Sequence, residues 1–296
     1  MILSEIDTVD DISKEVFLNK YFKPRKPVLI KGFAKKWDAY NKWNLDYIYE
    51  QADEQVVGLY DNKPADPSRA TDEPITRMKM RDYIRLIQTQ PSDLRIFFYI
   101  ITDKLPELLK NFSYPDLGFK YFKRIPTLFF GGSEARVLMH YDVDLADLMH
   151  FQFEGKKRVL LFPPEEAAFL YKVPFSVHTI YNVDYEQPDY ERFPALRYAK
   201  GHEIFMDHGD ALFMPSGYWH FNRYLEAGFS VTLRSFPSSP KKLFSLLKEV
   251  FFIRYTDKLM RKLFKQKWVD YKQRQAFKKS QKALDAYLKQ PNTIPA

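Results

Sequence analysis

The sequence predicts a mainly β protein with a mixed α/β lead-in and a helical C-terminal appendage. Apolar, extended segments separated by turn residues dominate from about residue 94 to residue 236. Aromatic residues make up 17% of the chain, which supplies bulky side chains for the core of a β barrel. Beyond residue 240 the apolar residues recur at helical spacing in a strongly basic segment.

The lead-in alternates between helical and extended patterns. Its expected elements are, in chain order, a helix capped by Asp7 or Thr8, a strand at 27–33 ended by Gly32, a helix at 43–52, a polar loop with three prolines at 61–74, a helix at 80–88 and a strand at 94–101. We interpret residues 1–238 as one domain that includes this lead-in, with its barrel at about 94–236. Residues 239–296 form the appendage.

The triplet His-Tyr-Asp at 140–142 is the first half of a predicted metal site. Its flanks are apolar and extended, so the side chains of His140 and Asp142, two residues apart on a strand, would project from the same face. His220 follows 78 residues after Asp142, at the end of GDALFMPSGYWH. A Gly-Asp turn, an apolar run, and a proline and a glycine that interrupt β pairing would place His220 at the lip of the barrel.

Two imidazoles and one carboxylate can occupy one face of an octahedral metal ion. Three positions then stay open, as non-heme Fe(II) oxygenases require for a cosubstrate and dioxygen. A structural zinc site would usually be closed by four protein ligands. The alternative is a core histidine at position 220 and an Asp142 that caps a turn. The three residues together with both flanking patterns favour the metal site.

With these residues in place, the sequence resembles the cupin-like, JmjC-related 2-oxoglutarate oxygenases, the group that includes the asparaginyl hydroxylase acting on hypoxia-inducible factor. The resemblance runs through residues 27–48, 155–164 and 209–236 in addition to the HYD triplet. It implies a double-stranded β-helix (jelly-roll, cupin-type) fold. It also implies Fe(II) held by His140, Asp142 and His220, and 2-oxoglutarate as cosubstrate.

Lys157 is the first candidate for a cosubstrate contact. It lies in GKKRVLLFPP, a strand that is apolar on both faces and is therefore expected to be buried on two sides. A cation in such a layer needs an anion. The resemblance implies that Lys157 pairs with the distal carboxylate of 2-oxoglutarate, whereas Arg158 is the weaker candidate. The alternative is that Lys157 lies at the wet end of the strand and extends to solvent.

Two further residues are candidates for the same pocket. His150 alternates with apolar neighbours on the preceding strand and is expected to face the barrel interior, although a hydrogen-bonded core histidine is the commoner case. The alternation places Tyr99 on the same face as Phe97 and Ile101, from where its hydroxyl could donate to a cosubstrate carboxylate. Packing explains Tyr99 nearly as well.

Three positions depart from the pattern of the family. Relatives often carry Thr three residues before the first metal His and Asn soon after the Asp, and both touch the cosubstrate; these positions hold Val137 and Leu148 here. Arg234, in SVTLRSF, stands where Asn or another small polar residue is common. A buried guanidinium requires a carboxylate, of a ligand or of the protein, so Arg234 is also a candidate contact in a rearranged pocket.

The C-terminal segment carries all of the net basicity. Residues 241–296 hold 15 Lys and Arg against 4 Asp and Glu, a balance of +11, whereas the first 240 residues hold 31 against 34, a balance of −3. Apolar residues at helical spacing predict an amphipathic helix or a helix pair; they are Leu243, Leu246, Leu247, Val250, Phe251, Leu259, Leu263 and Phe264. Packing on the barrel, a second subunit, an anionic membrane surface and nucleic acid are the competing uses. The resembling hydroxylase dimerises through C-terminal helices, which favours a homodimer.

Composition limits the chemistry further. The chain has no Cys, which excludes disulfides, thiolate ligands and cysteine nucleophiles. The N-terminus lacks the basic start and apolar stretch of an export signal, so we expect a cytoplasmic protein.

The function that we expect is that of an Fe(II)- and 2-oxoglutarate-dependent dioxygenase, a hydroxylase of a protein side chain or of a small molecule. Two alternatives stay open. One is a cupin-fold protein that binds a metal without turnover. The other is a protein that docks on nucleic acid or on an anionic membrane through its basic tail, with the barrel as a scaffold.

Overall fold

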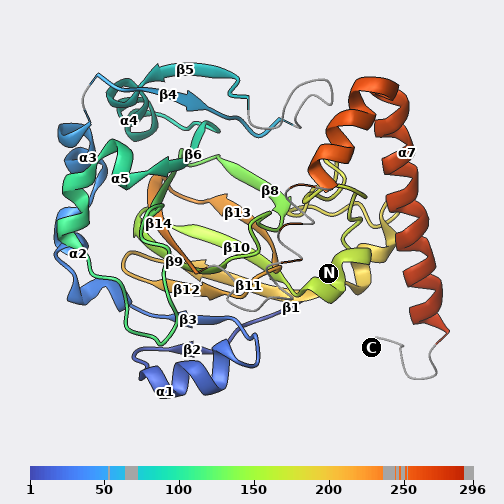
Figure 1. The fold of residues 1–296 in the computed structure, drawn as a ribbon, viewed down its shortest axis with the longest axis horizontal. Coiled ribbons are helices and arrows are strands. Elements are labelled where there is room, and N and C mark those ends of the chain that lie inside the picture. The colour runs from blue at the N-terminus through green and yellow to red at the C-terminus, as the bar shows by residue number, and fades with distance from the viewer. Residues whose placement is uncertain are drawn as a thin grey trace.

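Two β sheets face each other at the centre of the molecule, with helices and loops around them (Figure 1). The computed structural model describes residues 1–52, 54–63, 73–235 and 253–289, together with positions 244, 247 and 251. The predicted residues Leu243, Leu246 and Val250 lie outside the described residues, as does most of the 61–74 loop. The predicted mainly β, jelly-roll type of fold is confirmed.

Eight antiparallel strands form the core, four in each sheet. Their bounds are β7 (Thr127–Gly131), β8 (Arg136–His140), β9 (Asp147–Glu154), β10 (Lys157–Phe162), β11 (Lys200–Met206), β12 (Ala211–Met214), β13 (Trp219–Tyr224) and β14 (Gly228–Ser235). One sheet has the order β11-β10-β13-β8 and the other the order β12-β9-β14-β7. This is the pairing of a double-stranded β-helix.

The interior between the sheets is apolar on one side and polar on the other. The apolar side lies along β11 and β12; its buried residues are Leu148, Val159, Leu161, Ile204, Met206, Leu212 and Met214. The inward positions of β13 and β14 instead hold polar side chains; these are His220, Asn222, Tyr224, Ser230, Thr232 and Arg234. The polar side is therefore where a ligand can be held.

The lead-in packs on the outer face of the sheet that contains β9 and β14. Its elements are β1 (Ile2–Ser4), β2 (Thr8–Val9), α1 (Lys14–Val16), η1 (Phe17–Phe22), β3 (Val28–Ile30), η2 (Phe33–Lys36), α2 (Asp38–Lys42), α3 (Leu45–Gln51), β4 (Val56–Leu59), β5 (Thr76–Lys79), α4 (Met80–Thr89), β6 (Arg95–Ile100), α5 (Ile101–Lys104) and η3 (Pro106–Asn111). Aromatic contacts join it to the sheet, with Trp37 and Phe151 rings 4.7 Å apart and Trp43 and Phe153 rings 4.6 Å apart.

The first nine residues form an outer strand of each sheet. β1 pairs in parallel with β11 in the smaller sheet, and β2 pairs in parallel with β3 in the larger one. The expected helix cap at Asp7 or Thr8 is therefore wrong, because Thr8 is part of β2. Ser13 caps α1 instead and accepts a hydrogen bond from the Val16 amide.

A bulge in β6 changes which side chains face the core. The register with β7 shifts between Ile96 and Tyr99, and Phe98 has a φ of 61°, in the left-handed region. Tyr99 consequently packs in the core of the lead-in, whereas Phe97 and Phe98 are 42% and 40% exposed. The predicted shared face of Phe97 and Tyr99 is wrong for this reason.

The C-terminal segment is a helical hairpin, α7 (Arg254–Leu288), whose two arms follow each other directly. The chain reverses at Lys265, whose φ of 46° and ψ of −127° are not helical. The second arm packs beside two short helices, η4 (Pro164–Ala168) and η5 (Pro194–Tyr198), where Ser280 donates to the Ala168 carbonyl (2.6 Å). Among the described helices, none combines the length and apolar character needed to cross a bilayer.

Candidate metal centre

β8 and β13 bring the two predicted histidine ligands together. His140 is the last residue of β8 and pairs in register with His220, the second residue of β13. Their ring centroids are 4.2 Å apart. Antiparallel pairing thus joins two side chains that are 80 residues apart in the chain.

Asp142 comes from a turn and not from a strand. β8 ends at His140, and the chain then turns, with the Leu145 amide donating to the Asp142 carbonyl (3.0 Å) and Leu145 at a φ of 47°. The turn places Asp142 Oδ1 3.6 Å from His140 Nε2 and 3.7 Å from His220 Nε2. The alternation argument is therefore wrong in its reason, although the three predicted side chains do meet.

The three side chains fit a divalent ion. One ligand atom from each of His140, Asp142 and His220 lies within 4.8 Å of the other two, and no further His, Asp or Glu of the described residues belongs to the group. Metal–ligand bonds are roughly 2.0–2.2 Å long, so atoms that share one ion lie within about 4.4 Å of each other. Small movements would bring these three atoms onto one ion.

Backbone carbonyls orient both imidazoles for metal binding. His140 Nδ1 lies 2.8 Å from the Leu138 carbonyl oxygen, and His220 Nδ1 lies 3.3 Å from that of Tyr218. A carbonyl oxygen only accepts, so each Nδ1 carries the hydrogen and each Nε2 directs its lone pair into the space that the two rings share with Asp142 Oδ1. This is the protonation pattern of a metal-ligating histidine.

Burial and local charges set the protonation states of the centre. Burial, and then the nearby His140, lower the pKa of His220 to about 4, so this ring is neutral at pH 7. Burial by itself would raise the pKa of Asp142, but the charge of the Arg234 guanidinium holds it well below its ordinary value. A neutral imidazole and an anionic carboxylate are the states that bind a divalent cation.

Arg234 contacts the carboxylate of Asp142, the third candidate ligand, on the side away from the two imidazoles. It is 4% exposed on β14, and its Nη1 donates to Asp142 Oδ2 (2.6 Å) and Asp144 Oδ2 (3.1 Å). The Phe98 ring lies 5.3 Å from the guanidinium carbon. The carboxylate that a buried arginine requires is therefore supplied by the protein itself.

Lys157 points into the polar side of the barrel and is 1% exposed. Its Nζ donates to Ser230 Oγ (2.6 Å), lies 3.0 Å from His150 Nε2 and is 4.4 Å from the centre of the Tyr224 ring. Burial lowers the pKa of Lys157 to about 7, and no carboxylate of the described residues offsets that effect. The alternative in which Lys157 extends to solvent is wrong.

His150 belongs to the same cluster. Burial, and then the charge of Lys157, hold the pKa of His150 well below its usual value. An ammonium group only donates, so the neutral ring accepts at Nε2 from Lys157 and donates from Nδ1 to Thr232 Oγ1, 2.7 Å away. His150 therefore orients the lysine ammonium.

Ser230, Thr232 and Asp144 were not among the predicted site residues. The signal for the first two is in SVTLRS, where polar residues alternate with a valine and a leucine that pack in the lead-in core. Polar residues facing a barrel interior indicate a ligand pocket. Asp144 gives no comparable signal, because acidic residues are common in turns.

Three other residues considered in the sequence add no cosubstrate contact to this cluster. Tyr99 donates its hydroxyl to Gln55 Oε1 (2.9 Å) within the lead-in core, so its position does not support a cosubstrate contact. Val137 is half-buried on β8 opposite Asn222, and Leu148 is buried on the apolar side of the interior. Neither supplies a polar group.

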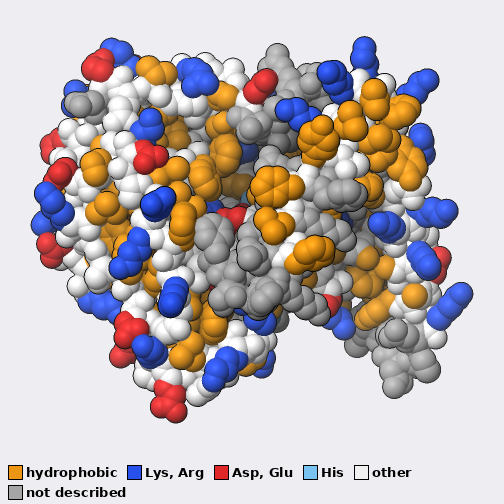
Figure 2. Space-filling model, in the orientation of Figure 1, with side chains coloured by type: hydrophobic (Ala, Val, Ile, Leu, Met, Phe, Trp, Pro, Cys, Tyr) orange, Lys and Arg blue, Asp and Glu red, His pale blue; other side chains and the backbone are white. Residues whose placement is uncertain are grey.

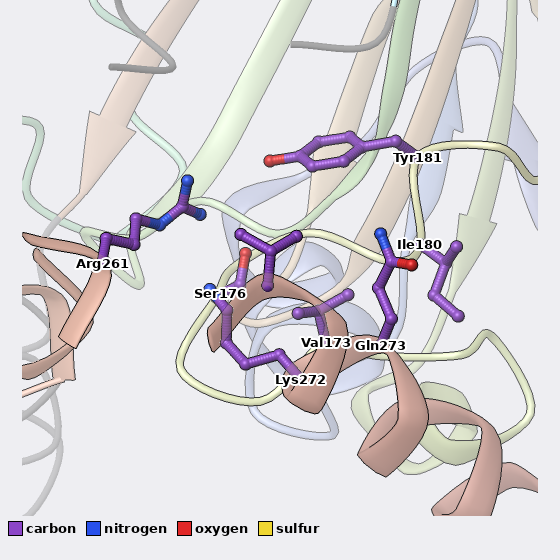
Figure 3. A pocket seen from close by; sticks show the side chains of 8 residues that line it. Val173, Ser176, Ile180, Tyr181, Arg261, Lys272 and Gln273 are labelled. Atoms are coloured by element: carbon purple, nitrogen blue, oxygen red, sulfur yellow. The ribbon is translucent and has the colours of Figure 1, made fainter. Parts of the chain in front are cut away.

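A loop at residues 172–181 packs against the end of β8, the strand that carries His140. The Tyr141 amide donates to the Val177 carbonyl (3.1 Å), and His178 forms an isolated β bridge with His140. Between this loop and α7 lies a small pocket, shown in Figure 3. It is lined by Val173, Ser176, Ile180, Tyr181, Arg261, Val269, Lys272 and Gln273, and includes none of the three candidate ligands.

The chain matches the sequence model of the cupin-like domain over residues 13–236. It belongs to the cupin-like domain family. This match covers every strand from β3 onwards, and both segments that carry the candidate ligands.

Curated proteins with JmjC-type domains are among the similar sequences of this cupin-like protein. Lysine-specific demethylase 8 of Xenopus tropicalis is 28% identical over 74% of this chain and 50% of its own length. HSPB1-associated protein 1 of Homo sapiens is 32% identical over 48% of this chain and 29% of its own. tRNA wybutosine-synthesizing protein 5 of Gallus gallus is 24% identical over 78% and 76%. This chain thus spans about half of the length of the first of these relatives.

Proposed function

We propose that this protein is an Fe(II)- and 2-oxoglutarate-dependent oxygenase, and more narrowly a hydroxylase. Membership of the cupin-like family and the similarity to lysine-specific demethylases support the oxygenase class. The cluster of His140, Asp142 and His220 supports the metal, because it offers two imidazoles and one carboxylate and leaves other positions free.

One observation supports the proposal that 2-oxoglutarate is the cosubstrate: Lys157 is a buried cation without a carboxylate partner among the described residues. A buried charge is costly unless it is paired, so the pocket favours an anionic ligand. In the β10–β13 ladder, Lys157 pairs with Tyr224 and His220 pairs with Leu161. Lys157 and His220 therefore lie four residues apart along the ladder. Four residues along a strand correspond to roughly 13 Å between the backbone positions of Lys157 and His220, and the lysine side chain spans part of this distance. A five-carbon dicarboxylate suits the remaining distance.

The residues of the chain have separate tasks in this mechanism. Bound Fe(II) would supply the activation of dioxygen, with oxidative decarboxylation of the 2-oxo acid to succinate and CO2 and transfer of one oxygen atom to the substrate. His140, Asp142 and His220 hold the ion on one side. Lys157 orients the cosubstrate through its distal carboxylate, and the apolar side of the barrel excludes water.

The substrate that we propose is a C–H bond of a protein side chain or of another molecule that reaches the open side of the ion. The names of the similar proteins refer to lysine demethylation and to tRNA wybutosine synthesis. Hydroxylation of a methyl group on nitrogen is one route to demethylation, so a single oxygenase chemistry covers both a hydroxylase and a demethylase.

The test is cosubstrate binding to the metal-loaded protein without oxygen, followed by succinate formation with oxygen. Charge-assisted hydrogen bonds contribute roughly 1.5–3 kcal/mol, so Lys157→Ala should weaken 2-oxoglutarate about tenfold to a hundredfold without removing the metal. Lys156→Ala is the matched control, since Lys156 is exposed and pairs with Glu226. Equal affinity in wild type and Lys157→Ala would contradict this cosubstrate site. Equal affinity in Lys157→Ala together with a loss of about tenfold to a hundredfold in Arg234→Ala would move the site to Arg234.

A metal-binding protein without turnover is the second candidate function. Val137 and Leu148 favour it, because two polar cosubstrate contacts that are common in relatives are missing. The same experiment separates the two candidates: succinate release that depends on Fe(II) supports the oxygenase. Stoichiometric metal binding with no 2-oxoglutarate binding supports the second candidate.

A further inference from the structure

One guanidinium nitrogen holds two carboxylates at the candidate metal centre. Arg234 Nη1 donates to the Oδ2 atoms of both Asp142 and Asp144. Only the first of these carboxylates takes part in the group of ligand atoms that could share an ion. The second is two residues further along the same turn, and accepts from the Ala146 amide (3.2 Å).

Because Arg234 binds one oxygen of Asp142, the two oxygens of this carboxylate have different neighbours. Oδ2 is hydrogen-bonded to Arg234, while Oδ1 lies 3.6 Å and 3.7 Å from the two Nε2 atoms. With Oδ2 engaged, only Oδ1 faces the space between the two imidazoles, where an ion would be held. A free carboxylate could instead use both oxygens and occupy one of the open positions.

Asp144 would compete for the same ion if its carboxylate were free to turn. A divalent cation attracts every nearby carboxylate, and a short turn does little to keep one away. The ion pair with Arg234 gives Asp144 another partner. Arginine suits this task because the planar guanidinium fixes the directions of the two Nη1–H bonds, whereas lysine presents one compact charge on a rotating ammonium group.

The surroundings of Arg234 support a role beyond packing. The side chain is 4% exposed, and its Nε has no hydrogen-bond partner within the described part of the chain. Phe98, which covers it, has a backbone conformation in the left-handed region. A buried, incompletely bonded cation under a strained aromatic residue disfavours folding, and such features concentrate at functional sites.

We propose that Arg234 is a positioning residue that presents one oxygen of Asp142 to the ion and withholds Asp144 from it, so that three positions remain open. This inference rests on the proposed metal centre. Without the arginine, the ion would gain an additional carboxylate oxygen and lose a site for water or cosubstrate.

Manganese(II) is the probe, because it needs no oxygen-free handling and reports its bound waters through water-proton relaxation. The variants are Arg234→Gln, Asp144→Asn and the double variant, each checked for folding by thermal melting. Removing one positive charge next to the ion should tighten Mn(II) by about tenfold in Arg234→Gln. The same variant should lose metal-bound water and bind 2-oxoglutarate at least about tenfold more weakly.

The double variant tests the reason for that loss. In Asp144→Asn alone, the affinities for Mn(II) and 2-oxoglutarate should stay within about twofold of wild type. In the double variant, the asparagine should restore the metal-bound water. If Arg234 only supports the fold, Arg234→Gln should instead weaken Mn(II), and Asp144→Asn should restore nothing; that result overturns the inference. A wild-type protein that binds no Mn(II) overturns the metal centre itself.

Arg234→Lys provides a second route if the glutamine variant does not fold. It keeps the buried charge but cannot hold both carboxylates in the same geometry, so it should also lose metal-bound water. Wild-type water content and wild-type cosubstrate affinity in folded Arg234→Lys would overturn the inference.

Discussion

Single atoms decide what the candidate centre can bind. Each imidazole presents Nε2 because a backbone carbonyl fixes Nδ1, and Asp142 presents Oδ1 because Arg234 engages Oδ2. The buried Lys157 ammonium adds a positive charge deeper in the same interior. A ligand that chelates a metal at one end and carries a carboxylate at the other matches this distribution of charge.

His220→Ala should abolish stoichiometric binding of Fe(II) or Mn(II) while leaving most of the fold intact. The change removes one of three ligands, and two ligands hold a divalent ion far more weakly. Calorimetric titration measures the loss. His202→Ala is the matched control, because His202 contacts Ser4 on the outer strand of the smaller sheet. Undiminished metal binding in His220→Ala would contradict the assignment of His140, Asp142 and His220 as the metal centre.

The affinity for 2-oxoglutarate should fall as the pH rises above about 7. Burial lowers the pKa of Lys157 to about 7, and the groups that face it are neutral: His150 from β9, Tyr224 from β13 and Ser230 from β14. A bound carboxylate favours the ammonium form, so binding above this pKa takes up a proton. The dissociation constant should then rise up to about tenfold per pH unit.

Lys157→Arg distinguishes this explanation from a general effect of pH. A guanidinium stays charged across the whole range, so the variant should lose the pH dependence even if its affinity is lower. Calorimetry in buffers of different ionisation enthalpy measures the proton uptake directly. Proton uptake that persists in the arginine variant would assign the titration to another group.

The ligands could be predicted from the sequence because their types and spacing carry the chemistry. The partners of Arg234 could not, since Asp142 and Asp144 reach it only after β8 ends and the chain turns at Leu145. The position of Tyr99 could not be predicted for a related reason. Alternation assumes a regular strand, and the bulge at Phe98 breaks it.

At the scale of elements, one carboxylate joins the two arms of α7. Asp257 accepts hydrogen bonds from Trp268 Nε1 (2.8 Å) and Lys272 Nζ (2.5 Å) on the second arm, and from Arg261 Nε (2.8 Å) on its own. Lys272 is 2% exposed. The helical spacing in the sequence indicates helix here, but it does not predict these contacts, which join residues 11 and 15 positions apart.

Asp257→Ala should destabilise the hairpin by about 3–5 kcal/mol, which is the typical cost of leaving a buried charge, here that of Lys272, without its partner. The cost is smaller to the extent that Lys272 loses its proton. Hydrogen exchange would show faster exchange in both arms of α7 than in β9 or β14. Asp285→Ala is the control, because Asp285 is exposed and accepts a hydrogen bond from Gln281 on its own arm. Equal protection in the two variants would mean that packing on η4 and η5 maintains the hairpin.

The whole molecule presents an apolar and basic surface on the first arm of α7 and just before it. Figure 2 shows hydrophobic side chains gathered over this region. The exposed residues are Phe244 69%, Leu247 46%, Phe251 67%, Tyr255 70%, Leu259 45%, Leu263 61% and Phe264 50%. A patch of this kind favours a partner, and we propose a second copy of the chain, since symmetric dimers are the commonest assembly.

Light scattering should therefore give the mass of a dimer, and Leu263→Asp should give a monomer. Phe205→Asp is the matched control, because Phe205 is 53% exposed on β11, away from α7. Removal of the residues after Pro240 should yield a monomer or an aggregating barrel. A full-length protein that is monomeric at micromolar concentration contradicts the dimer, and salt-sensitive binding to RNA or to anionic vesicles would then identify the partner class.

The pairing of β1 with β11 and of His140 with His220 also determines when the molecule can assemble. Leu3 pairs with Gly201, so the first strand has no partner until two thirds of the chain has been made. At about 5–20 residues per second, ribosomal synthesis leaves roughly 4–16 s between the emergence of the two histidines. We expect that a metal ion would enter a finished barrel, because the growing chain holds only an incomplete set of the candidate ligands.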